Sequence, residues 1–219
     1  MPDETTRDEM GGWHAPFVLL VLLLVALVAV ASRLVLADPD RDVVVVGDSI
    51  TVVSSAALHG ELDRDNDVQI RANLGVTFEV MQPSAAELAA TDPDAAVIEL
   101  GSNDALLEVP FATTEAQIDR MVETFRAAGT ECIVVVDVNT EMRRNDGKVV
   151  TAGATAINDH LAELAAANDD VVVVGWDAAL RDAEATGETL LPDTVHPEAP
   201  GARLLAVLVG EALEEHCDD

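Results

Sequence analysis

After residue 42, short apolar runs alternate with stretches of helical periodicity. The runs are rich in Val, Ile and Ala, and they fall at residues 43–46, 68–74, 95–100, 132–136 and 171–174. Between them, apolar side chains recur every three or four residues, as at Ile118, Met121, Val122 and Phe125. This spacing predicts helices at residues 51–58, 83–90, 114–128, 154–167 and 198–215. Strands that alternate with helices indicate an α/β domain whose parallel sheet is covered on both faces.

The first apolar stretch of the chain differs from the others, because it is long and uncharged. Residues 10–32 carry no formal charge when His14 is neutral, and residues 15–31 are almost entirely Val, Leu and Ala. A helix of that length, at about 1.5 Å per residue, reaches about 35 Å, enough to cross a hydrocarbon core of about 30 Å. The pattern predicts a polar tail (1–14), a transmembrane anchor (15–36), a linker (37–42) and a folded domain (43–219).

A cleaved signal peptide is the alternative to a retained anchor. Small residues suited to cleavage occur at Ala29-Val30-Ala31 and again at residues 35–37. A signal peptide normally has a basic start and a shorter apolar stretch of about 7–15 residues. Here the leading segment holds four acidic residues and only Arg7. The sequence therefore favours a single-pass membrane protein, with secretion after cleavage as the other possibility. Charge does not settle its orientation, because Arg7 lies on one side of the segment and Arg33 and Arg41 lie on the other. The expectation that the domain is extracytoplasmic rests on the possible disulfide described below.

Charge excludes several classes of partner. The chain has 41 acidic and 12 basic residues, a formal net charge of −29. Nothing in this composition would neutralise a row of phosphates, so nucleic acid is excluded, as is binding to anionic lipid headgroups. The same charge disfavours anionic substrates at long range. A hydrophobic content of 49% argues against disorder, and the composition leaves the oligomeric state open.

Polar residues gather where the predicted strands end. In a parallel sheet of this kind, ligands bind at the carboxyl ends of the strands. Gly47-Asp48-Ser49 follows the first strand, Gly75 follows the second, and a Gly-Ser-Asn-Asp segment (101–104) follows the third. An Asp-x-x-His segment (193–196) follows the fifth strand after a loop. Each of these, taken alone, is more typical of a helix cap or a turn. Their arrangement at one edge of the sheet points to a shared site.

The residue types in this set suit nucleophilic catalysis. A serine hydroxyl such as that of Ser49 is a weak nucleophile until a base, here His196, accepts its proton. Asp193 lies three residues before His196, so a tight turn can bring its carboxylate to the other ring nitrogen. The Ser49 N–H lies in the first turn of a helix, where negative charge is stabilised. Gly75 and Asn103 are further candidate donors for an oxyanion.

These segments together resemble the GDSL/SGNH hydrolase family. The resemblance rests on Gly47-Asp48-Ser49, Gly75, Gly101-x-Asn103-Asp104 and Asp193-x-x-His196, in that order, and it spans about residues 42–215. It implies a flavodoxin-like three-layer α/β/α sandwich with strand order 2-1-3-4-5. It also implies metal-free and cofactor-free serine hydrolysis of carboxylic esters. The matching positions imply a triad of Ser49, Asp193 and His196, and an oxyanion hole of the Ser49 N–H, Gly75 and Asn103.

Two other functional classes compete with this one. The 101–104 segment superficially resembles an element of metal-dependent phosphoesterases, although no Asp-x-His follows the first strand. A non-catalytic module that binds carbohydrate or lipid at the same edge is the second alternative. For the enzyme, we expect a small-molecule, glycan or lipid ester as substrate, most simply a short-chain acyl or acetyl ester.

The two cysteines give one further expectation. Cys132 opens the fourth strand, at the end of the sheet away from the candidate site. The last helix starts near that site and runs back, so Cys217 also ends on the far side. A Cys132–Cys217 disulfide is therefore allowed, with two free thiols as the alternative. A disulfide would place the domain in an oxidising compartment.

Overall fold

The computed structural model describes residues 41–217, and these form an α/β/α sandwich. The predicted tail (1–14), anchor or signal peptide (15–36) and all but the end of the linker lie outside the described residues. Within residues 41–217, no helix has both the length and the apolar character needed to cross a membrane.

A five-stranded parallel sheet forms the middle layer, and its order is β2-β1-β3-β4-β5, as predicted. The strands are β1 (Arg41–Gly47), β2 (Asn66–Ala72), β3 (Ala95–Glu99), β4 (Cys132–Val136) and β5 (Val171–Val174). The four valines of β1 are 0 to 1% exposed. Helices cover both faces of the sheet, which explains why β1, β3, β4 and β5 contain continuous apolar runs. The edge strand β2 is only partly buried and alternates polar and apolar residues.

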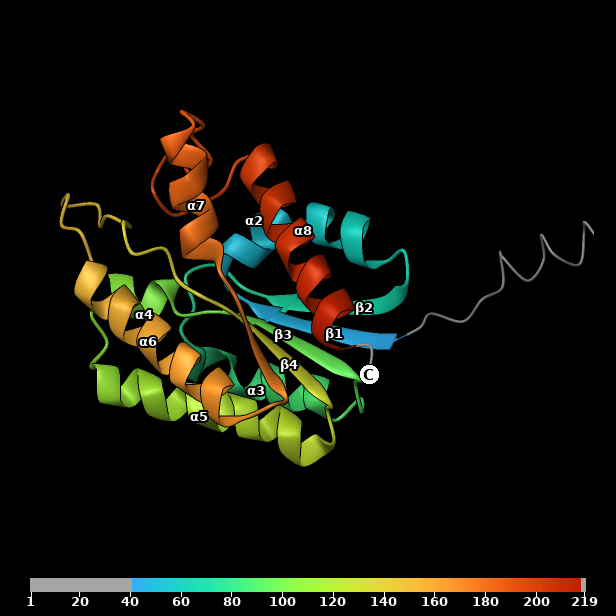
Figure 1. Cartoon of the computed structure of the whole chain (residues 1–219). Coiled ribbons are helices and arrows are strands. Elements are labelled where there is room, and N and C mark those ends of the chain that lie inside the picture. The colour runs from blue at the N-terminus through green and yellow to red at the C-terminus, as the bar shows by residue number, and fades with distance from the viewer. Residues whose placement is uncertain (1–40, 218–219) are drawn as a thin grey trace, which may run out of the picture. The chain divides into compact units, whose positions relative to one another are not determined.

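The outer layers consist of helices on opposite faces of the sheet (Figure 1). One face carries α2 (Ser49–Leu62) and α8 (Ala199–His216), and the other carries α3 (Phe78–Ala89), α5 (Phe111–Ala128) and α6 (Thr151–Ala167). Two further helices, α4 (Ser102–Leu106) and α7 (Trp176–Ala185), follow β3 and β5. The apolar stripe predicted for residues 114–128 faces the core, since Ile118, Met121, Val122 and Phe125 are all buried.

Several predicted boundaries were wrong, and capping explains some of them. Helix α2 begins at Ser49 rather than residue 51, because the side chain of Asp48 caps it by accepting the N–H of Ile50 at 2.8 Å. Helix α3 begins at Phe78, so Pro83 lies inside it rather than in its first turn. The second strand ends at Ala72, two residues before the predicted end.

Helices α4 and α7 were not predicted. Helix α4 has only five residues, too few to show helical periodicity. Helix α7 is dominated by alanine and charged residues, with few apolar positions from which to recognise a stripe.

Register places the ends of three strands side by side. Gly47 at the end of β1 pairs with Ala72 of β2 and with Glu99 of β3. The segments that follow these strands therefore leave the sheet at the same edge. This edge carries the polar residues singled out in the sequence.

Disulfide Cys132–Cys217 is present, as the sequence allowed. It joins the start of β4 to the residue after α8, with the Cα atoms 5.5 Å apart. It lies at the end of the sheet opposite the polar edge.

Candidate active site

Ser49 is held at the junction of β1 and α2. Gly47 ends the strand, and a Cβ atom at this position would lie 1.9 Å from the Thr51 Oγ1 atom. Only glycine fits here without a shift, so the first turn of α2 packs directly on the end of β1. The Ser49 residue is 5% exposed. Its hydroxyl is therefore presented from a rigid and largely buried position.

His196 approaches this hydroxyl from the segment before α8. The His196 Nε2 atom lies 2.9 Å from the Ser49 Oγ atom. The His196 Nδ1 atom lies 2.7 Å from the Asp193 Oδ2 atom. The structure therefore brings together three residues, separated by up to 147 positions, in the order serine, histidine, aspartate.

A tight turn aligns the aspartate with the histidine. The Asp193 Oδ1 atom accepts the backbone N–H groups of Val195 at 2.9 Å and His196 at 2.7 Å. Thr194, inside the turn, has a φ of 69°, a left-handed conformation that is unusual for a β-branched residue. Partial burial raises the pKa of Asp193, but hydrogen bonds from the His196 ring and from the two N–H groups outweigh it and leave the pKa below its ordinary value. The carboxylate is therefore charged at neutral pH.

Asn103 lies in α4, and its side chain is oriented by a buried carboxylate. The Asn103 Nδ2 atom donates to the Asp48 Oδ2 atom at 2.9 Å. Because a side-chain amide has two N–H groups, this bond leaves one of them for another acceptor. Gly101, just before α4, has a φ of 112°, and a Cβ there would lie 2.9 Å from a Val138 methyl group. Glycine is thus required for α4 to start where it does.

A second buried carboxyl group lies behind Asp48. Glu99 ends β3, and its Oε2 atom accepts the Thr51 N–H at 3.1 Å and the Thr51 hydroxyl at 2.7 Å. Burial raises the pKa of Asp48 to about 6, although hydrogen bonds from Ile50, Asn103 and Glu99 lower it in part. Burial, reinforced by the charge of Asp48, raises the pKa of Glu99 well above its ordinary value. Both pKa values are raised for the same reason, because two carboxyl groups buried side by side resist carrying two negative charges.

Sequence reasoning missed this carboxyl pair. It treated Asp48 as part of the motif without a partner, and it did not single out Glu99. The signal was present, since Glu99 is an acidic residue that ends an otherwise apolar run, and such a residue is costly to bury without a role.

The predicted oxyanion donor Gly75 lies in the loop between β2 and α3. Its φ is 69°, which explains the glycine. It does not line the cleft that contains Ser49, Asn103, Asp193 and His196. Its part in the site therefore stays a prediction.

The cleft has a volume of about 430 Å³. One wall comes from Leu106 and Leu107 at the end of α4, and another from residues 143–146 of the loop between β4 and α6 (residues 137–150, the β4–α6 loop). Sequence reasoning did not predict that this loop borders the site.

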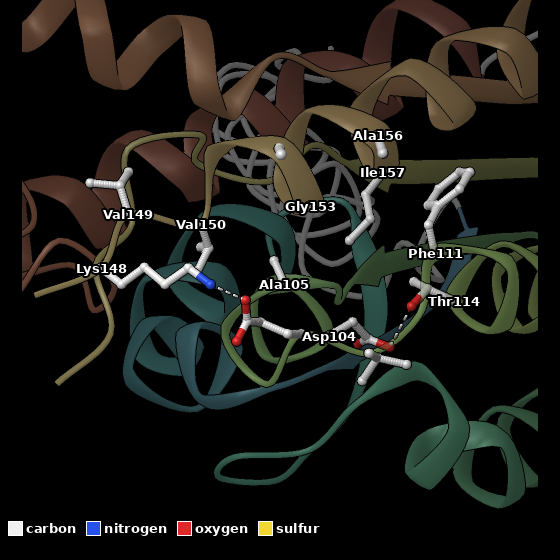
Figure 2. Close-up of a pocket in the computed structure, with 13 residues that line it drawn as sticks. Asp104, Ala105, Phe111, Thr114, Lys148, Val149, Val150, Gly153, Ala156 and Ile157 are labelled. Atoms are coloured by element: carbon white, nitrogen blue, oxygen red, sulfur yellow. Dashed lines mark hydrogen bonds and ion pairs between the residues drawn. The ribbon is translucent and has the colours of Figure 1, made fainter. Parts of the chain in front are cut away.

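A second, more apolar pocket of about 340 Å³ lies among α4, α5 and α6 (Figure 2). Phe111 and Ile157 line it, and at its inner end Asp104 accepts the Thr114 hydroxyl at 3.4 Å and the Phe78 N–H at 3.1 Å. Burial raises the pKa of Asp104 to about 6. Asp104 thus serves to join the end of β3 to α3 and α5 rather than to line the catalytic cleft.

Among residues 41–217, no group of three or more His, Cys, Asp and Glu side chains is arranged to hold a metal ion. The chemistry that the arrangement supports is proton removal from the Ser49 hydroxyl by His196, next to backbone and amide donors.

Solved structures share this fold. A GDSL-like lipase from Bacteroides thetaiotaomicron superposes with a TM-score of 0.69 at 20% identity, covering 85% of this chain and 95% of the other. A lipase/acylhydrolase from Enterococcus faecalis gives 0.67 at 21% identity, covering 80% and 95%. The C-terminal catalytic domain of Streptococcus pneumoniae peptidoglycan O-acetyltransferase A gives 0.61 at 19% identity, covering 83% and 97%.

Sequence comparison identifies the family. No curated protein sequence matches the chain. The model of the GDSL-like lipase/acylhydrolase family matches residues 45–204, which is well over half of the chain and includes every candidate site residue. Ester hydrolysis and acyl transfer are the chemistry that this family supports. The chain belongs to the GDSL-like lipase/acylhydrolase family.

Proposed function

We propose that this protein hydrolyses a carboxylic ester with Ser49 as nucleophile, His196 as general base and Asp193 as the residue that orients it. The observation that carries the proposal is the continuous path of short contacts, 2.9 Å from Ser49 to His196 and 2.7 Å from His196 to Asp193. Nucleophile, base and orienting group within hydrogen-bond reach are the arrangement that nucleophilic catalysis requires.

The reaction proceeds in two halves. His196 Nε2 takes the hydroxyl proton as the Ser49 oxygen forms a bond to the ester carbonyl carbon. The tetrahedral intermediate then expels the alcohol, which receives that proton from His196. Water, deprotonated by His196, then attacks the carbonyl carbon of the acyl-enzyme. The bond to the Ser49 oxygen breaks, that oxygen takes the proton back from His196, and the carboxylic acid is released. In both halves the Asp193 carboxylate stabilises the imidazolium.

The oxyanion is bound by the Ser49 N–H and the Asn103 amide, and Gly75, which does not line the cleft in this structure, is the predicted third donor. Because the Asp48 carboxylate fixes one N–H of Asn103, the other is held ready before the substrate arrives. Such preorganised donors are typically worth about 3–4 kcal/mol of barrier each.

For the substrate, we propose a short-chain acyl or acetyl ester on a small molecule or an envelope sugar, outside the cytoplasmic membrane. The similarity to a peptidoglycan O-acetyltransferase domain supports an acetyl group, and transfer to a sugar hydroxyl in place of water shares the same acyl-enzyme. The disulfide and the uncharged apolar stretch at 10–32 support an extracytoplasmic, membrane-anchored domain.

Hydrolysis of 4-nitrophenyl esters of increasing chain length tests the proposal. We expect the highest kcat/KM for acetate to butanoate, inactivation by a fluorophosphonate, no effect of EDTA, and loss of turnover in Ser49→Ala. Activity that survives in a folded Ser49→Ala protein would refute the mechanism. Loss of activity with EDTA would instead support a metal-dependent hydrolase. A wild-type protein that binds acetylated sugars without turnover would support a binding module.

A further inference from the structure

The charged groups that line the catalytic cleft are paired, with one exception. Arg144 contacts Glu108 at 2.6 Å and Asp146 at 3.6 Å, and Asp193 contacts His196. Arg143 also lines the cleft, yet its guanidinium has no ion pair or hydrogen bond among the described residues. In a chain with 41 acidic residues, this leaves one unmatched positive charge among the residues that line the cleft.

The backbone of Arg143 is fixed relative to the triad. Its N–H donates to the Thr194 hydroxyl at 2.9 Å, and Thr194 lies between Asp193 and His196 in sequence. The Thr194 carbonyl in turn accepts the Asn139 amide at 2.9 Å. On the other side, Met142 is fully buried in the core. The base of the Arg143 side chain is therefore rigid, while its exposed end is free to meet a ligand.

Ion pairs to Glu108 hold other parts of the β4–α6 loop and leave the Arg143 guanidinium unpaired among the described residues. Glu108, after α4, forms ion pairs with both Arg144 and Lys148, and the contact from Lys148 is seen beside the second pocket (Figure 2). Three of the twelve basic residues of the chain fall within residues 143–148. Arg144 and Lys148 share the Glu108 carboxylate, and Arg144 also contacts Asp146, so two negative charges offset these two positive charges. The positive charge that remains available at the cleft is that of Arg143.

We infer that Arg143 selects esters that carry an oxyanion group, a carboxylate or a phosphate, close to the scissile bond. This inference rests on the proposed ester hydrolysis and names its substrate class. The planar guanidinium binds carboxylate and phosphate through two parallel hydrogen bonds, which gives both energy and orientation. The net charge of the chain repels anions at long range, but at physiological ionic strength that field is screened beyond about 8 Å. Contact with Arg143 therefore decides which ester is bound productively.

Matched ester pairs test the inference. On the acyl side, 4-nitrophenyl hydrogen succinate is compared with 4-nitrophenyl butanoate, and on the alcohol side 3-carboxy-4-nitrophenyl acetate with 4-nitrophenyl acetate. The measured quantity is the ratio of kcat/KM for the anionic ester to that for its neutral partner, because the ratio cancels effects on the triad. In at least one pair, we expect Arg143→Gln to lower this ratio at least tenfold, equivalent to about 1.4 kcal/mol. Arg143→Lys should retain part of the selectivity.

The matched control is Arg120→Gln, which removes the same charge from an exposed position of α5 outside the cleft. We expect it to change neither ratio by more than twofold. Equal ratios in wild type and Arg143→Gln for both pairs would overturn the inference, and so would a loss of equal size in Arg120→Gln.

A binding measurement tests this inference independently of the proposed ester hydrolysis. Isothermal titration of the Ser49→Ala protein with methyl hydrogen succinate, methyl phosphate and methyl butanoate needs no turnover. Tighter binding of the succinate or of the phosphate, lost when Arg143→Gln is added, supports the inference even if no ester is hydrolysed, and it also tells the two anions apart. Equal binding of all three ligands would refute it while leaving the hydrolysis of neutral esters intact.

Discussion

Removing the Cys132–Cys217 disulfide is expected to cost much of the stability of the domain. The bond closes a loop with a sequence separation of 85 residues. In the chain-entropy model, opening a loop of that length increases the entropy of the unfolded state enough to destabilise the fold by about 4.5 kcal/mol at 25 °C. For a domain of this size, that corresponds to a fall in Tm of about 10 °C or more.

Cys217→Ser is the variant that tests this, because Cys217 follows the last helix and is only partly buried, whereas Cys132 is 5% exposed within β4. Urea unfolding followed by circular dichroism gives the free energy for wild type and variant, each with and without a reductant. The reductant should bring wild type close to the variant and leave the variant unchanged. A loss below about 1 kcal/mol in both comparisons would refute the reasoning from loop closure.

The same variant separates stability from catalysis. Helix α8 has 18 residues, so at about 1.5 Å per residue it places Cys217 about 27 Å from the His196 end. We therefore expect kcat on 4-nitrophenyl acetate to change by less than twofold at a temperature where the variant is folded.

Three further predictions concern the site and the buried carboxyl groups. Asp193→Asn should lower kcat on 4-nitrophenyl acetate by about 10³–10⁴-fold, because the imidazolium of His196 loses its counter-charge; a loss below tenfold would contradict the proposed role. The free energy of unfolding should fall as pH rises from 5 to 7.5, because groups with a raised pKa keep a proton in the folded state that the unfolded state has already lost. Each group whose pKa is about 6 contributes about 1.4 kcal/mol to this fall. A Tm that rises over this range would contradict the prediction. These groups are Asp48, Asp104 and Asp137, which directly follows β4 and whose pKa burial raises to about 6. Gly101→Ala should lower the urea midpoint by at least the equivalent of about 2 kcal/mol, because the positive φ strains an alanine and the new Cβ would clash with a Val138 methyl group. Gly60→Ala is the control, since this position on α2 faces open space, and it should not lower the midpoint.

The sheet and the contacts among Ser49, Asp193 and His196 were predictable from the sequence for a shared reason. Strands β1, β3, β4 and β5 contain continuous apolar runs, and chemically distinctive side chains follow β1, β3 and β5. Ser49, Asp193 and His196 could be associated because the carboxyl ends of parallel strands meet at one edge. The strand order itself came from the family resemblance, and the structure confirms it.

What the sequence did not reveal depends on packing between segments far apart in the chain. The bond from Asn103 to Asp48 joins residues 55 positions apart, and no local pattern encodes it. The β4–α6 loop borders the cleft because Arg143 is bonded to Thr194, a contact across 51 positions. Helix boundaries were missed where a cap such as Asp48 acts from outside the apolar pattern.

The close packing of Gly47 on Thr51 has a consequence for how the nucleophile behaves over time. Since the first turn of α2 has no space to slide toward β1, Ser49 samples few positions even before a substrate binds. The conformational entropy of positioning the Ser49 hydroxyl is then lost once, when the domain folds, and is not lost again in each turnover. In the proposed mechanism, a residue with no side chain and no contact with substrate thereby helps to hold the attacking oxygen in place before an ester arrives.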